Sequence, residues 1–76
     1  MSLPDPKVLQ ELLWYPMPFG KYKGTKLRAL PSYYLEWFSA RGFPEGKLGM
    51  LMSTMFIIRT HGLDFLLEQL EQLQEE

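Results

Sequence analysis

Proline and glycine residues divide this chain into four stretches in which apolar residues recur at intervals of three and four positions. This spacing places the apolar side chains on one side of an α-helix, so each stretch is predicted to be helical. The proline and glycine residues between the stretches interrupt the helices. We therefore expect a mainly α fold of the α+β class, with about four short helices around a small core, in a single domain that covers residues 1–76.

Capping residues mark the boundaries of the predicted helices. Asp5 followed by Pro6 is typical of a helix start, because the aspartate side chain accepts a hydrogen bond from a free N–H group and Pro6 has no N–H to leave unpaired. Ser32 is the predicted N-cap of the second helix. Gly42 and Gly62 are expected to end the second and third helices, since glycine adopts the left-handed backbone conformation that commonly follows a helix.

The segment 17–31, between the first two helices, has a different pattern. It reads MPFGKYKGTKLRALP, in which polar and apolar residues alternate over a short run. This alternation predicts one short β-hairpin near residues 19–28, with its turn at Lys23 and Gly24. An isolated hairpin is marginal in water, so this one must pack against the helices. The residues expected to attach it to the core are Phe19, Leu27 and Leu30.

Positive charge gathers in the same segment, although the net charge of the chain is −1. Four basic residues lie within eight positions, and residues 17–31 contain no acidic residue. We expect this group to contact the phosphates of DNA or RNA, with a tyrosine stacked on an unpaired base. The alternative is that the lysines protect an exposed β edge from pairing with other chains. The predicted nucleic-acid-binding residues are Lys21, Tyr22, Lys23, Lys26 and Arg28, and Phe19, Gly20 and Gly24 are predicted to shape the motif.

The C-terminal stretch carries the opposite charge. Residues 64–76 contain five acidic residues and no basic residue, and their leucines are spaced for one face of a helix. The sequence leaves open whether this acidic helix neutralises the basic segment or lies away from it.

The third predicted helix, at about residues 47–60, is apolar nearly all round. A helix of this kind is either central in its domain or shared with a partner, and a chain of 76 residues offers little protein to surround it. The alternative hypothesis for function is therefore a homodimer, or an adaptor for a protein partner, that uses this helix and has no nucleic-acid role. The predicted interface residues are Met50, Ser53, Thr54 and Ile57.

Patterns typical of catalysis are missing from the sequence. It contains no cysteine and a single histidine, His61, which lies beside a glycine at a predicted helix end and is expected to contact the last carbonyls there. An enzyme would need a carboxylate pair assembled from Glu36, Glu45 or Asp64, whereas the glutamates of the chain are expected at solvent-facing positions of the helices. We expect no enzyme activity, no catalytic residue, no metal site and no cofactor.

The composition also suggests a cellular setting. The absence of cysteine fits a reducing, cytoplasmic environment. The first residues, MSLPDP, lack the basic head and apolar run of a signal peptide. No stretch reaches the roughly 20 apolar residues that span a bilayer, so no membrane partner is expected.

Several motifs resemble known families. MPFGKYKG at 17–24, LP at 30–31, YLxWF at 34–38 and FPxGxLG at 43–49 resemble the small bacterial proteins described as "putative quorum-sensing-regulated virulence factors". This resemblance covers nearly the whole chain and implies a regulatory association without a stated activity. Residues 17–38 are also similar to an accessory C-terminal domain of exodeoxyribonuclease X-type exonucleases, which implies a nucleic-acid context, although the catalytic carboxylates of those enzymes belong to a separate domain. The motif positions are Phe19, Gly20, Lys21, Lys23, Gly24, Tyr34 and Trp37, of which Phe19, Tyr34 and Trp37 are expected to pack in the core.

Overall fold

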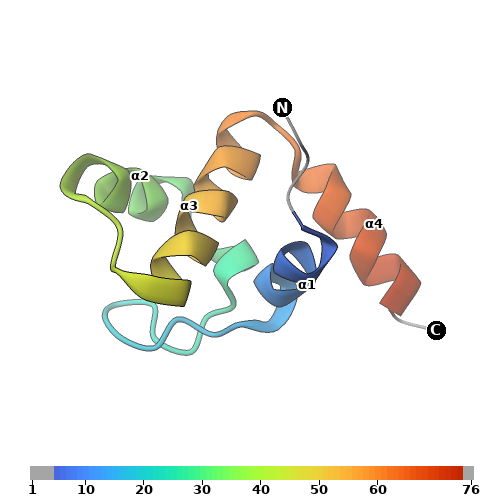
Figure 1. Ribbon diagram of the computed structural model, residues 1–76, viewed down its shortest axis with the longest axis horizontal. Coiled ribbons are helices and arrows are strands. Elements are labelled where there is room, and N and C mark those ends of the chain that lie inside the picture. The colour runs from blue at the N-terminus through green and yellow to red at the C-terminus, as the bar shows by residue number, and fades with distance from the viewer. Residues whose placement is uncertain (1–4, 75–76) are drawn as a thin grey trace.

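The computed structural model describes residues 5–74, and within this range four α-helices and one 3₁₀ turn follow one another along the chain (Figure 1). The predicted mainly α architecture is confirmed, whereas the described residues contain no β-strand. The elements are α1 (Pro6–Trp14), the 3₁₀ turn η1 (Leu27–Ala29), α2 (Ser32–Arg41), α3 (Gly46–Thr60) and α4 (Asp64–Gln74).

Helix α3 lies at the centre of the arrangement. It packs against α2 on one side and against α1 and η1 on the other, and α4 packs on α1 (Figure 1). Each helix and the segment between α1 and α2 contribute apolar side chains to one core, and burying one such side chain contributes about 1.5 to 3 kcal/mol. The buried residues are Leu12, Leu13, Met17, Leu27, Leu30, Leu35, Leu51, Met52, Met55, Ile58 and Leu67.

The helix starts follow the predicted caps with one exception. The Asp5 side chain accepts a hydrogen bond of 2.8 Å from the backbone N–H of Lys7, and Pro6 is the first residue of α1. Ser32, in contrast, is already helical, and Pro31 takes the N-cap position. The Ser32 hydroxyl instead accepts a hydrogen bond of 3.3 Å from the Arg59 guanidinium. A contact from α3 therefore replaces the predicted capping role.

The predicted ends of α2 and α3 are confirmed. Gly42 follows the last residue of α2, and Gly62 lies two residues after α3 with a φ of 67°. Beyond α3, the N–H of Leu63 donates to the carbonyl of Ile58 at 2.9 Å, which is the long hydrogen bond of a Schellman motif. The turn at Gly62 lies at the sharp bend between α3 and α4. Within the described range no single helix is long and apolar enough to cross a membrane, and the one helix pair that meets the length and composition test together is bent by 111°.

The predicted hairpin near residues 19–28 is wrong, and the chain reverses over a longer loop. Met17 donates to the Thr25 carbonyl at 2.8 Å and accepts from the Gly24 N–H at 2.8 Å, with an isolated bridge between Pro16 and Lys26. Because prolines 16 and 18 lack N–H groups, Met17 is the only donor on its side of this pairing and a ladder cannot extend. The predicted two-stranded hairpin is therefore replaced by an isolated bridge, beside which the N–H of Leu27 donates to the carbonyl of Tyr15 at 3.0 Å.

The second predicted strand, residues 25–28, gives way to η1. Leu27 and Leu30 are three residues apart, and a 3₁₀ turn places both on the same side, where they are fully buried. They attach the segment to the core as predicted. Phe19 does not, because it remains 44% exposed, and Met17 is the third buried anchor instead.

Candidate functional site

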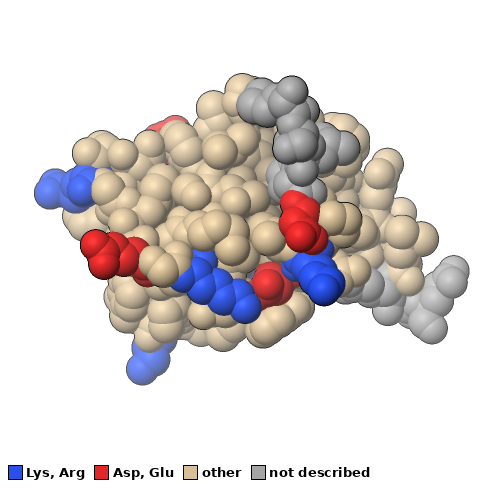
Figure 2. Space-filling view, viewed as in Figure 1, with Lys and Arg blue, Asp and Glu red and all other residues tan. Residues whose placement is uncertain are grey.

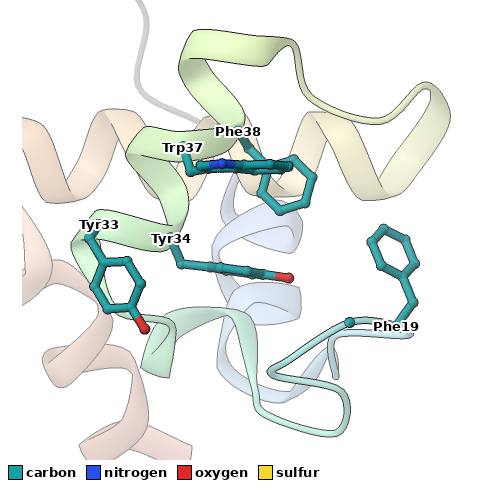
Figure 3. A pocket seen from close by; sticks show the side chains of 6 residues that line it. Phe19, Tyr33, Tyr34, Trp37 and Phe38 are labelled. Carbon is teal, nitrogen blue, oxygen red and sulfur yellow. The ribbon is translucent and has the colours of Figure 1, made fainter.

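An aromatic groove of about 390 Å³ lies between α2 and the loop that precedes η1 (Figure 3). Four of its residues come from α2, at positions i, i+1, i+4 and i+5, which place them on one face of the helix. The loop supplies the opposite wall. The groove is lined by Phe19, Gly20, Tyr33, Tyr34, Trp37 and Phe38.

The rings of the groove leave much of their surface open. Phe19, Tyr33 and Trp37 are 44%, 55% and 50% exposed, whereas Tyr34 is half-buried. In Figure 3 the rings of Trp37 and Tyr34 are seen edge-on, one above the other, and Phe19 projects from the loop toward Phe38. Phe38 meets both α2 rings edge to face, with centroids 5.2 Å from Tyr34 and 5.0 Å from Trp37. Phe19 and Trp37 therefore lie at the surface and not in the core, where they were expected.

Gly20 brings the loop backbone close to α2. Its φ is +80°, and a Cβ built on it would lie 2.9 Å from the Tyr34 hydroxyl oxygen. Any other residue would therefore be strained in its backbone and would displace the tyrosine. Gly24 also has a positive φ, of +88°, but a Cβ there would meet no atom within 4 Å. Of the predicted shaping residues, Gly20 thus contacts the groove and Gly24 serves the turn alone.

Tyr22 and Lys21 connect the loop to the start of α2. Tyr22 is half-buried, meets the Tyr34 ring edge to face at 4.7 Å, and shares a hydrogen bond between its hydroxyl and that of Tyr33. The Lys21 ammonium lies 5.8 Å from the centre of the Tyr33 ring and 3.4 Å from its hydroxyl oxygen. Tyr22 therefore supports the groove from behind, and Lys21 places a positive charge beside it.

The other predicted basic residues divide into two groups. Lys23 and Lys26 are exposed, and their side chains make no ion pair among the residues that the structure describes. Arg28, in contrast, forms an ion pair with Glu71 of α4. The acidic helix therefore neutralises one of the four cations of the basic segment and leaves the three lysines unpaired within the described range.

Sequence reasoning missed two arginines near this site. Arg41, in the last turn of α2, lies 4.5 Å from the centre of the Trp37 ring. The sequence could have predicted this contact, because Trp37 and Arg41 are four residues apart on one helix. Arg59 of α3 donates to the carbonyls of Leu30 at 2.7 Å and Arg28 at 2.8 Å. These bonds, which we call the Arg59 clasp, tie η1 to α3.

The predicted interface on α3 lies outside this groove. Met50 and Ile57 are exposed, and Ser53 and Thr54 between them are partly buried. Both hydroxyls donate to the carbonyl of Met50, at 3.0 and 2.8 Å. The four residues form an uncharged stripe whose polar groups are satisfied within the helix.

Acidic and basic side chains alternate across the face shown in Figure 2, so charge does not separate into two poles there. The Lys47 ammonium lies 2.6 Å from the Glu11 carboxylate. This hydrogen bond raises the pKa of Lys47 above its ordinary value of 10.5. Within the described residues, no group of three or more His, Cys, Asp or Glu side chains is placed to hold a metal ion.

Comparison with known proteins identifies the family. A model of the family described as "Putative quorum-sensing-regulated virulence factor" matches residues 5–70. The chain belongs to this family. It is also 51% identical over 57 residues to the uncharacterized protein YpeB of Escherichia coli strain K12, which covers 74% of this chain and 79% of that protein, and YpeB of Escherichia coli O157:H7 gives the same values. No solved structure matches the chain. The resemblance to this family noted from the sequence is thus confirmed, and neither name states an activity.

Proposed function

We propose that this protein is a small, non-catalytic regulatory module that binds nucleic acid through the three lysines of the loop. The observation that carries this proposal is that Lys21, Lys23 and Lys26 are exposed around one turn in a segment without acidic residues. A group of cations in this arrangement attracts a phosphate backbone, because each contact releases a condensed counterion. DNA and RNA both satisfy this chemistry.

The size of the expected effect follows from the number of unpaired cations. Three phosphate contacts give a slope of about −2 to −3 for the logarithm of the binding constant against the logarithm of salt concentration. Arg28 contributes less, since Glu71 already neutralises it. The net charge of −1 makes this a local attraction and not a property of the whole surface.

Two further points support a regulatory, nucleic-acid-linked role. The family description names quorum-sensing regulation. The sequence motifs at 17–38 also resemble an accessory domain of exonucleases. The proposed setting is the cytoplasm, where nucleic acid is available to such a module.

Fluorescence anisotropy tests the proposal. A labelled oligonucleotide, single-stranded and as a duplex, is titrated with the protein at low and moderate salt. The double variant Lys23→Glu, Lys26→Glu is expected to lose most of the binding. The single variant Lys23→Glu is compared with Lys7→Glu, which makes the same change of charge at an exposed lysine on α1. Failure to bind at low salt, or equal binding by the double variant and the wild type, would refute the proposal.

A second candidate function is homodimerisation through α3. It is favoured by the stripe of Met50, Ser53, Thr54 and Ile57, because two exposed apolar side chains flank two hydroxyls that need no water. Burying such a helix face against a second copy costs little desolvation free energy, because the hydroxyls keep their hydrogen bonds within the helix. The two candidates are compatible, since the stripe and the loop belong to different elements.

Light scattering over a range of concentrations tests the dimer. Ile57→Glu is expected to shift the protein to a monomer, and Phe65→Glu, at another exposed apolar residue, is expected to leave the mass unchanged. A wild-type protein that stays monomeric at high concentration would exclude this candidate.

A further inference from the structure

We propose that the aromatic groove holds an unpaired base, so that the module selects single-stranded nucleic acid over duplex. This inference rests on the proposed nucleic-acid binding and specifies the form of the strand. In a duplex each base is covered by its neighbours, whereas an unpaired base presents both ring faces to aromatic side chains. The lysines contact phosphates in either form, so selection must come from the groove.

The rings are arranged to receive a flat ligand. Trp37 and Tyr34 are three residues apart on α2 and their rings lie one above the other, while Phe19 closes the side opposite the helix (Figure 3). Arg41 lies over the Trp37 ring from the next turn toward the helix C-terminus, whereas Tyr34 lies toward the N-terminus. The Arg41 guanidinium thus covers part of the Trp37 ring. Phe38 lies edge to face against both Trp37 and Tyr34 and fills part of the space between them, but Trp37 remains 50% exposed, and this open part of the ring is available for stacking.

Charge complementarity favours a base over an uncharged aromatic or proline-rich ligand. Lys21 lies beside Tyr33 at the first turn of α2, and Arg41 lies beside Trp37 at the last turn. The groove thus has a cation near each end and no acidic residue in its lining. Glu36, the acidic residue of α2, lines a different hollow together with Arg59 and Thr60. An apolar ring attached to an anionic backbone matches this distribution.

The groove is also preformed. The Tyr34 ring is held edge-on by Tyr22 at 4.7 Å and by Phe38 at 5.2 Å, and its hydroxyl faces the backbone at Gly20. Side chains that are fixed before binding lose little conformational freedom when the ligand arrives. The site therefore needs no rearrangement to accept a base.

Tryptophan fluorescence provides the direct test. The variant Trp14→Phe leaves Trp37 as the sole tryptophan, since the chain contains two. This variant is titrated with a short thymidine oligonucleotide and, separately, with a duplex of the same length. Stacking predicts that the single strand quenches Trp37 and binds about five- to a hundredfold more tightly than the duplex.

Substitution of the groove then separates stacking from charge. Trp37→Ala is expected to reduce single-strand affinity to the level of the duplex while duplex affinity is unchanged, and Trp37→Phe is expected to retain part of the preference. Trp14→Ala removes the exposed tryptophan of α1 and serves as the matched control. Circular dichroism checks folding, and Phe19→Ala provides a second groove variant if Trp37→Ala unfolds.

The possible outcomes distinguish the two proposals. Equal affinity for single strand and duplex without quenching overturns the inference and leaves lysine-mediated binding intact. Absence of binding to either form removes the proposed function itself. Quenching of Trp37 by an uncharged proline-rich peptide, but not by the oligonucleotide, would show that the groove takes a different occupant.

Discussion

The segment between α1 and α2 has two halves that differ in how firmly they are attached. In the second half, Leu27 and Leu30 are buried, the Arg59 clasp holds the backbone, and Arg28 pairs with Glu71. In the first half only Met17 is buried, and none of residues 18–24, among them the exposed Phe19 and Lys23, is buried. The basic cluster of the sequence is therefore divided: its last cation forms an ion pair within the fold, and its lysines are exposed, as the proposed binding requires.

Truncation of one apolar side chain in each half is expected to give the largest difference in the free energy of unfolding. Leu27→Ala removes a fully buried side chain and should lower the free energy of unfolding by about 3 kcal/mol, because it leaves a cavity in the core. Phe19→Ala removes a larger but exposed side chain and should cost less than about 1 kcal/mol. Urea denaturation measures both values. Similar losses would mean that the halves are equally important for stability.

Removal of the Arg59 clasp is expected to cause the second-largest loss of stability. Arg59→Met leaves the partly buried carbonyls of Arg28 and Leu30 without donors and breaks the ion pair with Asp64, at a cost of about 2 kcal/mol. Arg41→Met, at an exposed arginine, should cost about 0.5 kcal/mol or less. Thermal and urea unfolding compare the two. If the variants are equally stable, η1 does not depend on the clasp.

The glycines of the loop provide a finer comparison. Gly20→Ala and Gly24→Ala both place a side chain at a positive φ, which costs about 1 to 2 kcal/mol. Only the first also crowds the Tyr34 hydroxyl. Gly20→Ala is therefore expected to weaken single-strand binding, whereas Gly24→Ala should leave it nearly unchanged once both proteins are fully folded. Anisotropy titrations of folded samples decide this, and identical affinities would argue against a role for the close approach at Gly20.

Glu71→Gln should release Arg28 from its ion pair and make its guanidinium available to nucleic acid. Loss of this partly exposed ion pair is expected to cost about 0.5 kcal/mol of stability. The released guanidinium adds one cation to the site, so the salt slope of nucleic-acid binding should become steeper by about 1. Glu68→Gln, on the same helix, is the control. An unchanged slope would indicate that Arg28 cannot reach the ligand even when unpaired.

Lys47 forms an ion pair, unlike the loop lysines within the described residues, and its substitution is expected to change stability least. Its pKa is raised in the folded state by the hydrogen bond to Glu11, so the pair stabilises the fold fully below pH 10.5 and loses this contribution as pH rises through the higher folded value. The melting temperatures of the wild type and Lys47→Met should therefore converge in strong alkali. A difference between the two melting temperatures that does not change with pH would contradict the assignment.

Helix positions were predictable because their signals are local. Asp5 with Pro6, and glycines 42 and 62, act on backbone groups within one turn, so the sequence contains both the cause and the effect. The predicted hairpin failed although its evidence was also local. Alternation over residues 19–28 favours two strands, but the two prolines remove backbone donors and the three-residue spacing of Leu27 and Leu30 favours a 3₁₀ turn.

The groove was only partly predictable. The pairs Tyr33 with Trp37 and Tyr34 with Phe38 are visible as i, i+4 neighbours, but sequence spacing does not tell whether such a face is covered. A small domain buries a limited share of its surface, and here the loop covers only part of these rings. The Arg59 clasp had no signal at all, because its partners are backbone carbonyls about thirty residues away.

The Arg59 clasp also links binding to folding. Its hydrogen bonds hold the end of the loop segment against α3, so the site is assembled only when elements distant in the chain are in place. A ligand of the groove therefore binds the folded state and not the unfolded chain. At a hundred times its dissociation constant such a ligand would add about 2.7 kcal/mol to the free energy of unfolding. A rise in melting temperature can thus report binding without a label, which makes this small domain suitable for screening ligands of unknown identity.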